Sequence, residues 1–405
     1  MFELMTECSI QDSSNPSFFI PADPIQQQVI FGEGVSARVG EFAKQLGSHA
    51  LVVTDAGVLS AGHPQKIITS LHSAGLKTFL FDRTIENPTD SSICACAREV
   101  ESLGIDLIVG VGGGSSLDTA KGTNFILTNG GSMLDYWGVG KAKNPLLPMI
   151  AIPTTAGTGS ECQSYALISH DQTCRKMACG DSTALPKVTL LDPELTLSQP
   201  FSVCAATGMD ALAHTLESLV CKKRNAWSDG HAKKGFSLLM QNLATVWNEP
   251  ENLKARGAVL LGAAHAGAAI ERSMLGAAHA LANPLTSQRG IIHGQAIGLT
   301  LPAVLSYNQE DPAVRKIYAQ LARDSGLAQG GTPDSLAFDL LLKKVLYLRK
   351  ISHLPTRLSE VGCKPSTIIE LAKDAADQWT ASFNPRPVGE PELFGIYQSI
   401  DAHAG

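Results

Sequence analysis

The 405-residue sequence lacks several features that would each point to a particular class of protein. Its nine cysteines form no C-x-x-C pair. The closest two, Cys94 and Cys96, lie on a predicted helix, so reduced thiols are a better interpretation than a disulfide framework or a cysteine metal site. The chain has no long run of one charge and a net charge of only −6, which argues against nucleic acid or an anionic membrane surface as its main partner.

A targeting or membrane-spanning segment is also missing from the sequence. The N-terminus carries acidic and polar residues and no basic segment followed by an apolar one, so no secretory signal is visible. The longest uncharged run of small and apolar residues, 257–270, is too short to cross a bilayer and contains His265. We therefore expect a cytoplasmic location and no membrane partner.

The first half of the chain shows a regular alternation of strand and helix patterns. Short apolar runs at 50–54, 78–81, 106–111 and 149–152 are separated by helical segments, which is typical of βαβ units around a parallel sheet, and 28–32 resembles an edge strand. After 190–193 the strand patterns stop, and apolar residues recur at helical spacing almost to the C-terminus. We predict an α/β domain with a doubly wound parallel sheet, residues 1–197, followed by an all-helical domain, residues 198–405.

A glycine-rich turn follows the third of these strands. Gly112-Gly113-Gly114-Ser115 ends the apolar run and opens a helix, where free backbone N–H groups can receive a pyrophosphate. A tight strand-to-helix turn needs glycine for steric reasons alone, so the motif by itself leaves nucleotide binding and simple turn geometry open.

Polar residues at two other strand ends fit the same interpretation. Asp55 ends the first inner strand, where a carboxylate can accept hydrogen bonds from a ribose diol, although it could equally cap the next helix. The loop 153–161, which is rich in hydroxyls and glycines, follows the strand at 149–152. Ligands of parallel sheets bind at the carboxyl ends of the strands, so both features would meet a bound dinucleotide.

Four residues with metal-ligating side chains lie in apolar helical segments of the second half. Asp210 and His214 lie four positions apart and leave one face of a helix, and His279 and His293 lie in later segments of similar character. One carboxylate and three imidazoles can hold a divalent metal and leave a position for a substrate oxygen. A single histidine in such surroundings is more often a hydrogen-bonded core residue, and we retain that interpretation for His265.

These segments together closely resemble the iron-containing (group III) alcohol dehydrogenase family. The matches extend from Ile30-Phe31-Gly32-Glu33-Gly34 through the glycine turn, residues 153–161 and 209–214, His279 and His293-Gly294 to Asn384-Pro385-Arg386-Pro387. The resemblance covers about residues 25–400 and implies a dehydroquinate synthase-like fold. It implies metal ligation by Asp210, His214, His279 and His293. It implies contacts to the cofactor by Asp55, Gly113, Gly114, Ser115, Thr154, Thr155 and Lys176. An aspartate at position 55 implies NAD rather than NADP.

The sequence departs from the family pattern at three positions near the expected substrate pocket. Many relatives carry a histidine four residues after the third metal ligand, whereas this chain has Asn283. Gln163 replaces a common threonine, and Tyr165 occupies a position that is often smaller. We therefore expect intact metal and dinucleotide binding, with a substrate pocket and a proton-release route of its own.

The reaction implied by the resemblance is hydride transfer between a metal-bound alkoxide and nicotinamide, in an NAD-dependent alcohol dehydrogenase or aldehyde reductase. Iron and zinc both suit the ligand set. The expected partner is a small alcohol or aldehyde, and the expected assembly is a homodimer or higher homo-oligomer. The alternatives are a hydroxyacid-oxoacid transhydrogenase, a non-enzymatic metal-binding scaffold, and a dehydroquinate synthase-like lyase, for which the basic residues 222–224 would have to bind a phosphate.

Overall fold

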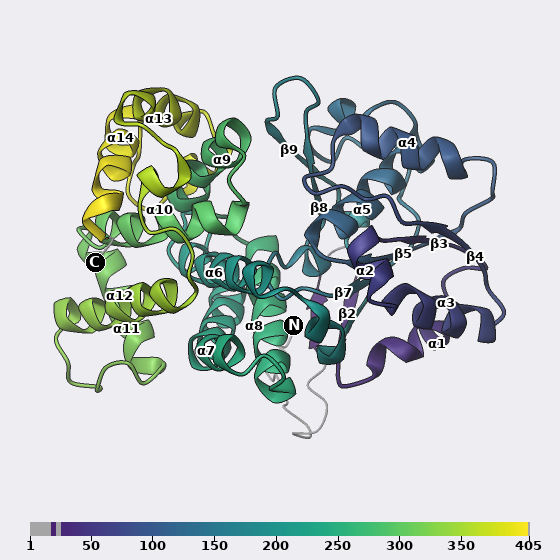
Figure 1. Cartoon of the computed structure of the whole chain (residues 1–405), viewed down its shortest axis with the longest axis horizontal. Coiled ribbons are helices and arrows are strands. Elements are labelled where there is room, and N and C mark those ends of the chain that lie inside the picture. The colour runs from purple at the N-terminus through teal and green to yellow at the C-terminus, as the bar shows by residue number, and fades with distance from the viewer. Residues whose placement is uncertain (1–17, 22–25, 404–405) are drawn as a thin grey trace, which may run out of the picture.

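The computed structural model describes residues 18–21 and 26–403 (Figure 1). Seven strands form the main sheet in the order β1-β2-β10-β7-β5-β3-β4. They are β1 (Phe18–Pro21), β2 (Gln26–Phe31), β3 (His49–Val53), β4 (Lys77–Phe81), β5 (Leu107–Gly112), β7 (Met149–Pro153) and β10 (Val188–Leu191). β1 runs antiparallel to β2, and the other neighbours are parallel. The four strands predicted from the apolar runs, now β3, β4, β5 and β7, are confirmed, and β4 forms one edge of the sheet.

Helices cover both faces of this sheet because successive side chains of a buried strand point to opposite sides. On one face Val52 packs in a core that includes residues of α1 (Val39–Ala43) and α3 (His63–Ser73). On the other face Leu51 packs with residues of α4 (Asp90–Val100) and α5 (Gly114–Asn129). Figure 1 shows these pairs below and above the sheet. The sheet is doubly wound, as predicted.

Two features of the strands differ from the sequence-based expectation. The segment expected as an edge strand is β2, which lies inside the sheet because β1 pairs with its outer side. A second sheet of three strands, β6 (Gly138–Val139), β9 (Lys176–Gly180) and β8 (Tyr165–Ser169), was not predicted. Its strands are short, so no long apolar run marks them in the sequence. β8 and β9 form an antiparallel hairpin, and β6 pairs with β9 only at Gly138 and Val139.

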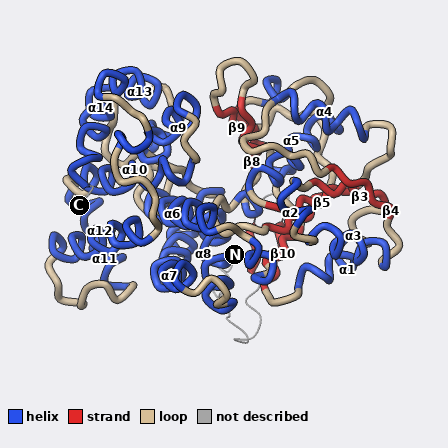
Figure 2. The backbone as a smooth tube through the Cα atoms, viewed as in Figure 1, coloured by secondary structure: helices blue, strands red, loops and turns tan. Residues whose placement is uncertain are grey.

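Beyond β10 the described chain, through residue 403, contains helices and turns without strands (Figure 2). Its helices are α6 (Phe201–Ser218), α7 (Ala226–Asn248), α8 (Leu253–Glu271), α9 (Ala277–Arg289), α10 (His293–Asn308), α11 (Pro312–Asp324), α12 (Asp334–Ile351), α13 (Ile368–Ala376) and α14 (Glu390–Ser399). They share one apolar core. Among the described helices, none combines the length and apolar character needed to cross a membrane.

Glycines of the loop after β7 bring the α/β domain into close contact with the helical region. A Cβ atom built on Gly157 would lie 2.2 Å from Thr207 Cβ on α6. A Cβ atom on Gly267 of α8 would lie 2.4 Å from the carbonyl oxygen of Gly159, whose own φ is +66°. These glycines therefore serve the docking of two parts of the chain, whereas the sequence had suggested that they face a ligand.

Candidate active site

A cavity of about 720 Å³, here called the cleft, lies where the carboxyl ends of the parallel strands face the helical region. Every residue that the sequence predicted for the site lines it. On the α/β side these are Asp55, Gly113, Gly114, Ser115, Thr154, Thr155, Gln163, Tyr165 and Lys176. On the helical side they are Asp210, His214, His279, Asn283 and His293. Residues far apart in the sequence thus meet in one place.

The four predicted metal ligands converge around one carboxylate oxygen. Asp210 Oδ1 lies 3.3 Å from His214 Nε2, 3.3 Å from His279 Nε2 and 3.7 Å from His293 Nε2. Asp210 and His214 lie on α6, whereas His279 is near the start of α9 and His293 is the first residue of α10. Asp210 Oδ1 and His279 Nε2 are buried without a hydrogen bond, which is costly for polar atoms.

The protonation states of Asp210, His214 and His293 suit a divalent cation. Burial lowers the pKa of His214 and of His293 to about 4, so both rings are neutral at pH 7. Burial alone would raise the pKa of the Asp210 carboxyl, but His214 and His279 hold it well below its ordinary value. The cluster therefore offers one carboxylate and two neutral imidazoles, the forms in which these side chains bind metals.

Glu217 is a further residue of this cluster that the sequence analysis did not identify. Its Oε2 lies 2.5 Å from His279 Nδ1, and its Oε1 accepts a hydrogen bond of 2.7 Å from the Ala278 N–H group. Burial opposes protonation of His279, but Glu217 and Asp210 on its two sides raise its pKa to about 9. Only the spacing of Glu217 from Asp210, two turns along one helix face, could have suggested this position from sequence.

The predicted cofactor residues surround the first turn of α5. Gly112 has a φ of +149°, which favours glycine, and a Cβ atom there would lie 2.5 Å from Ser116 Oγ. Asp55 uses both carboxylate oxygens: Oδ1 caps α2 (Ala56–Ser60) by accepting from the Val58 N–H group, and Oδ2 accepts from Ser116 Oγ. Asp55 is thus a helix cap that also lines the cleft.

The residues that depart from the family pattern line the cleft on both of its sides. Asn283 Nδ2 donates to Gln378 Oε1 at 3.1 Å, and Gln163 Nε2 donates to the Thr158 carbonyl at 2.9 Å. Tyr165 is joined there by Trp379, which the sequence analysis did not identify. Their rings are 6.4 Å apart and come from opposite sides of the cleft.

The basic residues after α6 do not face the cleft. Lys222 Nζ donates to the Ser382 carbonyl, Lys223 lies over the ring of Phe383, and Arg224 pairs with Asp229. None of the three lines the cavity. The phosphate site that a dehydroquinate synthase-like lyase would need is therefore not formed by these residues.

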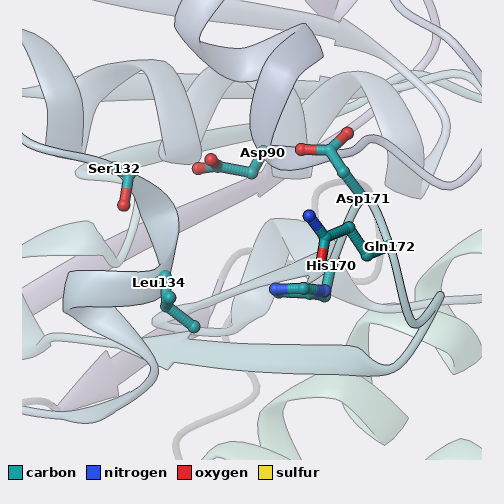
Figure 3. Close-up of a pocket in the computed structure, with 6 residues that line it drawn as sticks. All are labelled: Asp90, Ser132, Leu134, His170, Asp171 and Gln172. Carbon is teal, nitrogen blue, oxygen red and sulfur yellow. The ribbon is translucent and has the colours of Figure 1, made fainter.

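A second cavity, of about 210 Å³, lies on the α/β domain beside the start of α4 (Figure 3). Its two carboxylates are already engaged: Asp90 Oδ1 accepts from the Met133 N–H group, and Asp171 accepts from the backbone and hydroxyl of Ser91. These bonds fasten loops to the start of α4, so this cavity has a structural explanation.

Comparison with known proteins agrees with this geometry. Residues 26–193 match the model for iron-containing alcohol dehydrogenase, and residues 204–400 match that for the C-terminal part of the Fe-containing alcohol dehydrogenase family. Alcohol dehydrogenase 4 of Saccharomyces cerevisiae (strain YJM789) is 32% identical over 385 residues, which cover 95% of this chain and 98% of the relative. The NAD-dependent methanol dehydrogenase of Bacillus methanolicus is 32% identical over 371 residues, which cover 91% and 96%.

Solved structures give the same result. A crystal structure of 1,3-propanediol oxidoreductase superposes with a TM-score of 0.89 at 30% identity and covers 95% of this chain and 99% of that one. The chain therefore belongs to the iron-containing alcohol dehydrogenase family, whose members are oxidoreductases acting on the CH–OH group of alcohols.

Proposed function

We propose that the protein is a metal-dependent, NAD-linked alcohol dehydrogenase that also reduces the corresponding aldehydes. The observation that carries the proposal is the convergence of Asp210, His214, His279 and His293 in one cleft with the start of α5. Loading the protein with Fe²⁺ or Zn²⁺ and following NADH formation with a panel of small alcohols tests it. Absence of turnover with every alcohol and aldehyde, for either metal, would reject the proposal.

The four residues would hold the metal, and the buried atoms without hydrogen bonds, Asp210 Oδ1 and His279 Nε2, support this assignment. A bound metal would act as a Lewis acid on the substrate oxygen, and NAD would accept the hydride. The protein orients these groups by packing the ligands on three helices. Glu217 would keep the His279 proton on Nδ1, so that Nε2 presents a lone pair to the cation.

Replacement of Glu217 by Gln is expected to weaken metal binding about tenfold to a hundredfold, because mutation of the hydrogen-bond partner of a metal-ligating histidine lowers metal affinity by about that factor. The amide can still accept from the Ala278 N–H group, but it then presents an N–H group to His279 Nδ1 and favours the wrong tautomer. Metal affinity by competition with a chelator measures the effect. Glu161→Gln, at another buried carboxyl that does not line the cleft, is the control and should keep wild-type affinity.

For the cofactor, we propose that the pyrophosphate lies at the N-terminus of α5, against Gly113, Gly114 and Ser115. Three backbone N–H groups of a first helical turn lack helical partners and can donate to phosphate oxygens. A Cβ atom on Gly114 would lie 2.7 Å from Thr158 Cγ2, so the packing of the loop after β7 against this turn depends on glycine. Thr154, Thr155 and Lys176, which also line the cleft, would complete the cofactor site. We place the division between the two domains at 197/198.

Asn283→His is expected to change the pH dependence of alcohol oxidation near the ordinary histidine pKa of about 6.5, because an amide cannot exchange a proton near neutrality and an imidazole can. The effect on kcat should exceed the effect on metal affinity, since Asn283 lies one turn beyond His279 and binds Gln378. Rate profiles from pH 5.5 to 9, with a deuterated alcohol to establish that chemistry limits the rate, measure it. Superimposable profiles would leave Asn283 with a role in pocket shape alone.

The alternative functions receive less support. The relatives found include alcohol, methanol, propanediol, choline and 4-hydroxybutyrate dehydrogenases, and these names favour neither the transhydrogenase nor the lyase. A complete ligand set argues against a scaffold that has lost activity. Homo-oligomerisation stays a prediction, which light scattering would test.

A further inference from the structure

Tyr165 is held rigidly in the wall of the cleft. It alternates along β8 with residues of a buried core: Ala166 and Ile168 pack inward, whereas Tyr165 and Leu167 line the cleft. A Cβ atom on Gly180 of the paired strand β9 would lie 2.4 Å from Tyr165 Cε1, so the ring lies flat where the glycine leaves room. Buried Lys121 also donates to the Tyr165 carbonyl at 3.0 Å. The position of the ring is therefore fixed by its surroundings.

Trp379 is held on the opposite side of the cleft by different contacts. The residue before it, Gln378, accepts a hydrogen bond from Asn283, one helical turn after His279 on α9. The ring of Phe383 stands edge-on to Trp379 at 6.1 Å. Trp379 is nevertheless 41% exposed and lines the cleft. A side chain held in this way and left open to a cavity is available for a ligand.

The two rings meet across the cleft at 6.4 Å and 30°, within the range of aromatic pair contacts. Ile270 and Leu275 line the same cavity and add apolar surface. Lysine and arginine are scarce there, because Lys176 is the only one among the described residues that line the cleft, whereas four lining residues are aspartate or glutamate. Lys176 already donates to Asn87 Oδ1 at 2.7 Å, and Asp118 and Glu86 lie near it. A carboxylate on a substrate would therefore meet no unengaged lysine or arginine among the described residues that line the cleft.

We propose that Tyr165 and Trp379, one from each side of the cleft, form a subsite for the apolar tail of the substrate. The subsite makes the enzyme select uncharged primary alcohols and aldehydes with tails of several carbons over hydroxy acids of the same length. This inference rests on the proposed function and extends it to a substrate class. Tyr165 and Trp379 are specificity-determining residues, because they touch the tail and not the reacting carbon.

The first experiment compares kcat/KM of the metal-loaded enzyme for ethanol, butan-1-ol, hexan-1-ol and 4-hydroxybutyrate. Each methylene buried in the subsite should raise kcat/KM by up to about fourfold, which corresponds to about 0.8 kcal/mol at 1.4 kcal/mol per factor of ten. Butan-1-ol should exceed 4-hydroxybutyrate by at least about tenfold, because the carboxylate loses its hydration without gaining a partner. A flat dependence on chain length, or a preference for 4-hydroxybutyrate, would overturn the inference.

The second experiment assigns the preference to the two rings. Trp379→Ala should lower the ratio of kcat/KM for hexan-1-ol to that for ethanol by about tenfold, and Trp379→Phe should restore most of it. Tyr165→Ala should lower the same ratio. Trp137→Ala removes a tryptophan that is 39% exposed but lies outside the cleft, and it should keep the wild-type ratio. Equal ratios in Trp379→Ala and Trp137→Ala would overturn the assignment.

A binding measurement separates this inference from the proposed function. Hexanamide and acetamide are unreactive analogues of aldehydes, and calorimetry with NADH present compares their affinities without turnover. Hexanamide should bind about tenfold more tightly to the wild type and lose this advantage in Trp379→Ala. If no alcohol is oxidised, the proposed function fails, and the amide comparison alone supports or overturns the subsite.

Discussion

Replacement of His279 by Ala is expected to abolish metal retention and to lower kcat/KM for alcohol oxidation by about 10³-fold or more, on the order of 4 kcal/mol of transition-state stabilisation. His279 lies between Asp210 and Glu217, so its removal takes away a ligand atom and leaves two buried carboxylates without the imidazole that separated them. Metal content per chain by mass spectrometry and steady-state kinetics measure the two effects. Circular dichroism should show that the fold persists.

The control for this variant is His72→Ala. His72 lies on α3 and hydrogen-bonds Thr78, on the α/β domain and outside the cleft. It should retain wild-type metal content and activity. Full metal occupancy in His279→Ala would instead remove His279 from the ligand set and leave Asp210, His214 and His293.

Asp55→Gly is expected to raise the ratio of kcat/KM for NADP to that for NAD by about a hundredfold, because the carboxylate would repel a 2′-phosphate and bind a ribose diol. Glycine also removes the cap of α2, which costs helices a few tenths of a kcal/mol relative to the best caps. Asp55→Asn separates the two effects, since the amide oxygen can still accept from the Val58 N–H group while the charge is lost. Both variants should therefore shift the cofactor ratio.

Initial rates with each cofactor at saturating alcohol give these ratios, and the midpoint of thermal unfolding reports on the helix cap. If Asp55→Gly unfolds at a lower temperature and both variants keep the wild-type cofactor ratio, Asp55 acts only as the cap of α2.

The fold could be predicted where the hydrophobic pattern was continuous. β3, β5 and β7 are buried on both faces and appear as unbroken apolar runs, so these strands and the helices between them could be predicted from sequence. β8 and β9 could not be predicted, because one face lines the cleft and includes Tyr165 and Lys176. The position of β2 inside the sheet depends on β1, which lies among the first residues, where the sequence gives no family pattern.

The residues of the site could likewise be predicted only where a local sequence pattern marked them. Asp210 and His214 could be paired from their spacing on one helix, and His279 and His293 from their apolar surroundings and the family resemblance. Glu217 acts on a histidine 62 positions away, and Trp379 meets Tyr165 only across the cleft. Such contacts depend on how helices pack, which local patterns do not specify.

The contact of Gly159 with Gly267 has a consequence for how this protein can change over generations. Where side chains separate two parts of a molecule, a substitution on one side can be offset by another on the facing side. The distance between the two parts can then change in the course of evolution. Here main chain meets main chain, and any added carbon would fall within 2.5 Å of the opposite backbone. No compensating substitution smaller than glycine exists. Saturation mutagenesis at these two codons should therefore return glycine almost exclusively, although neither residue lines the cleft.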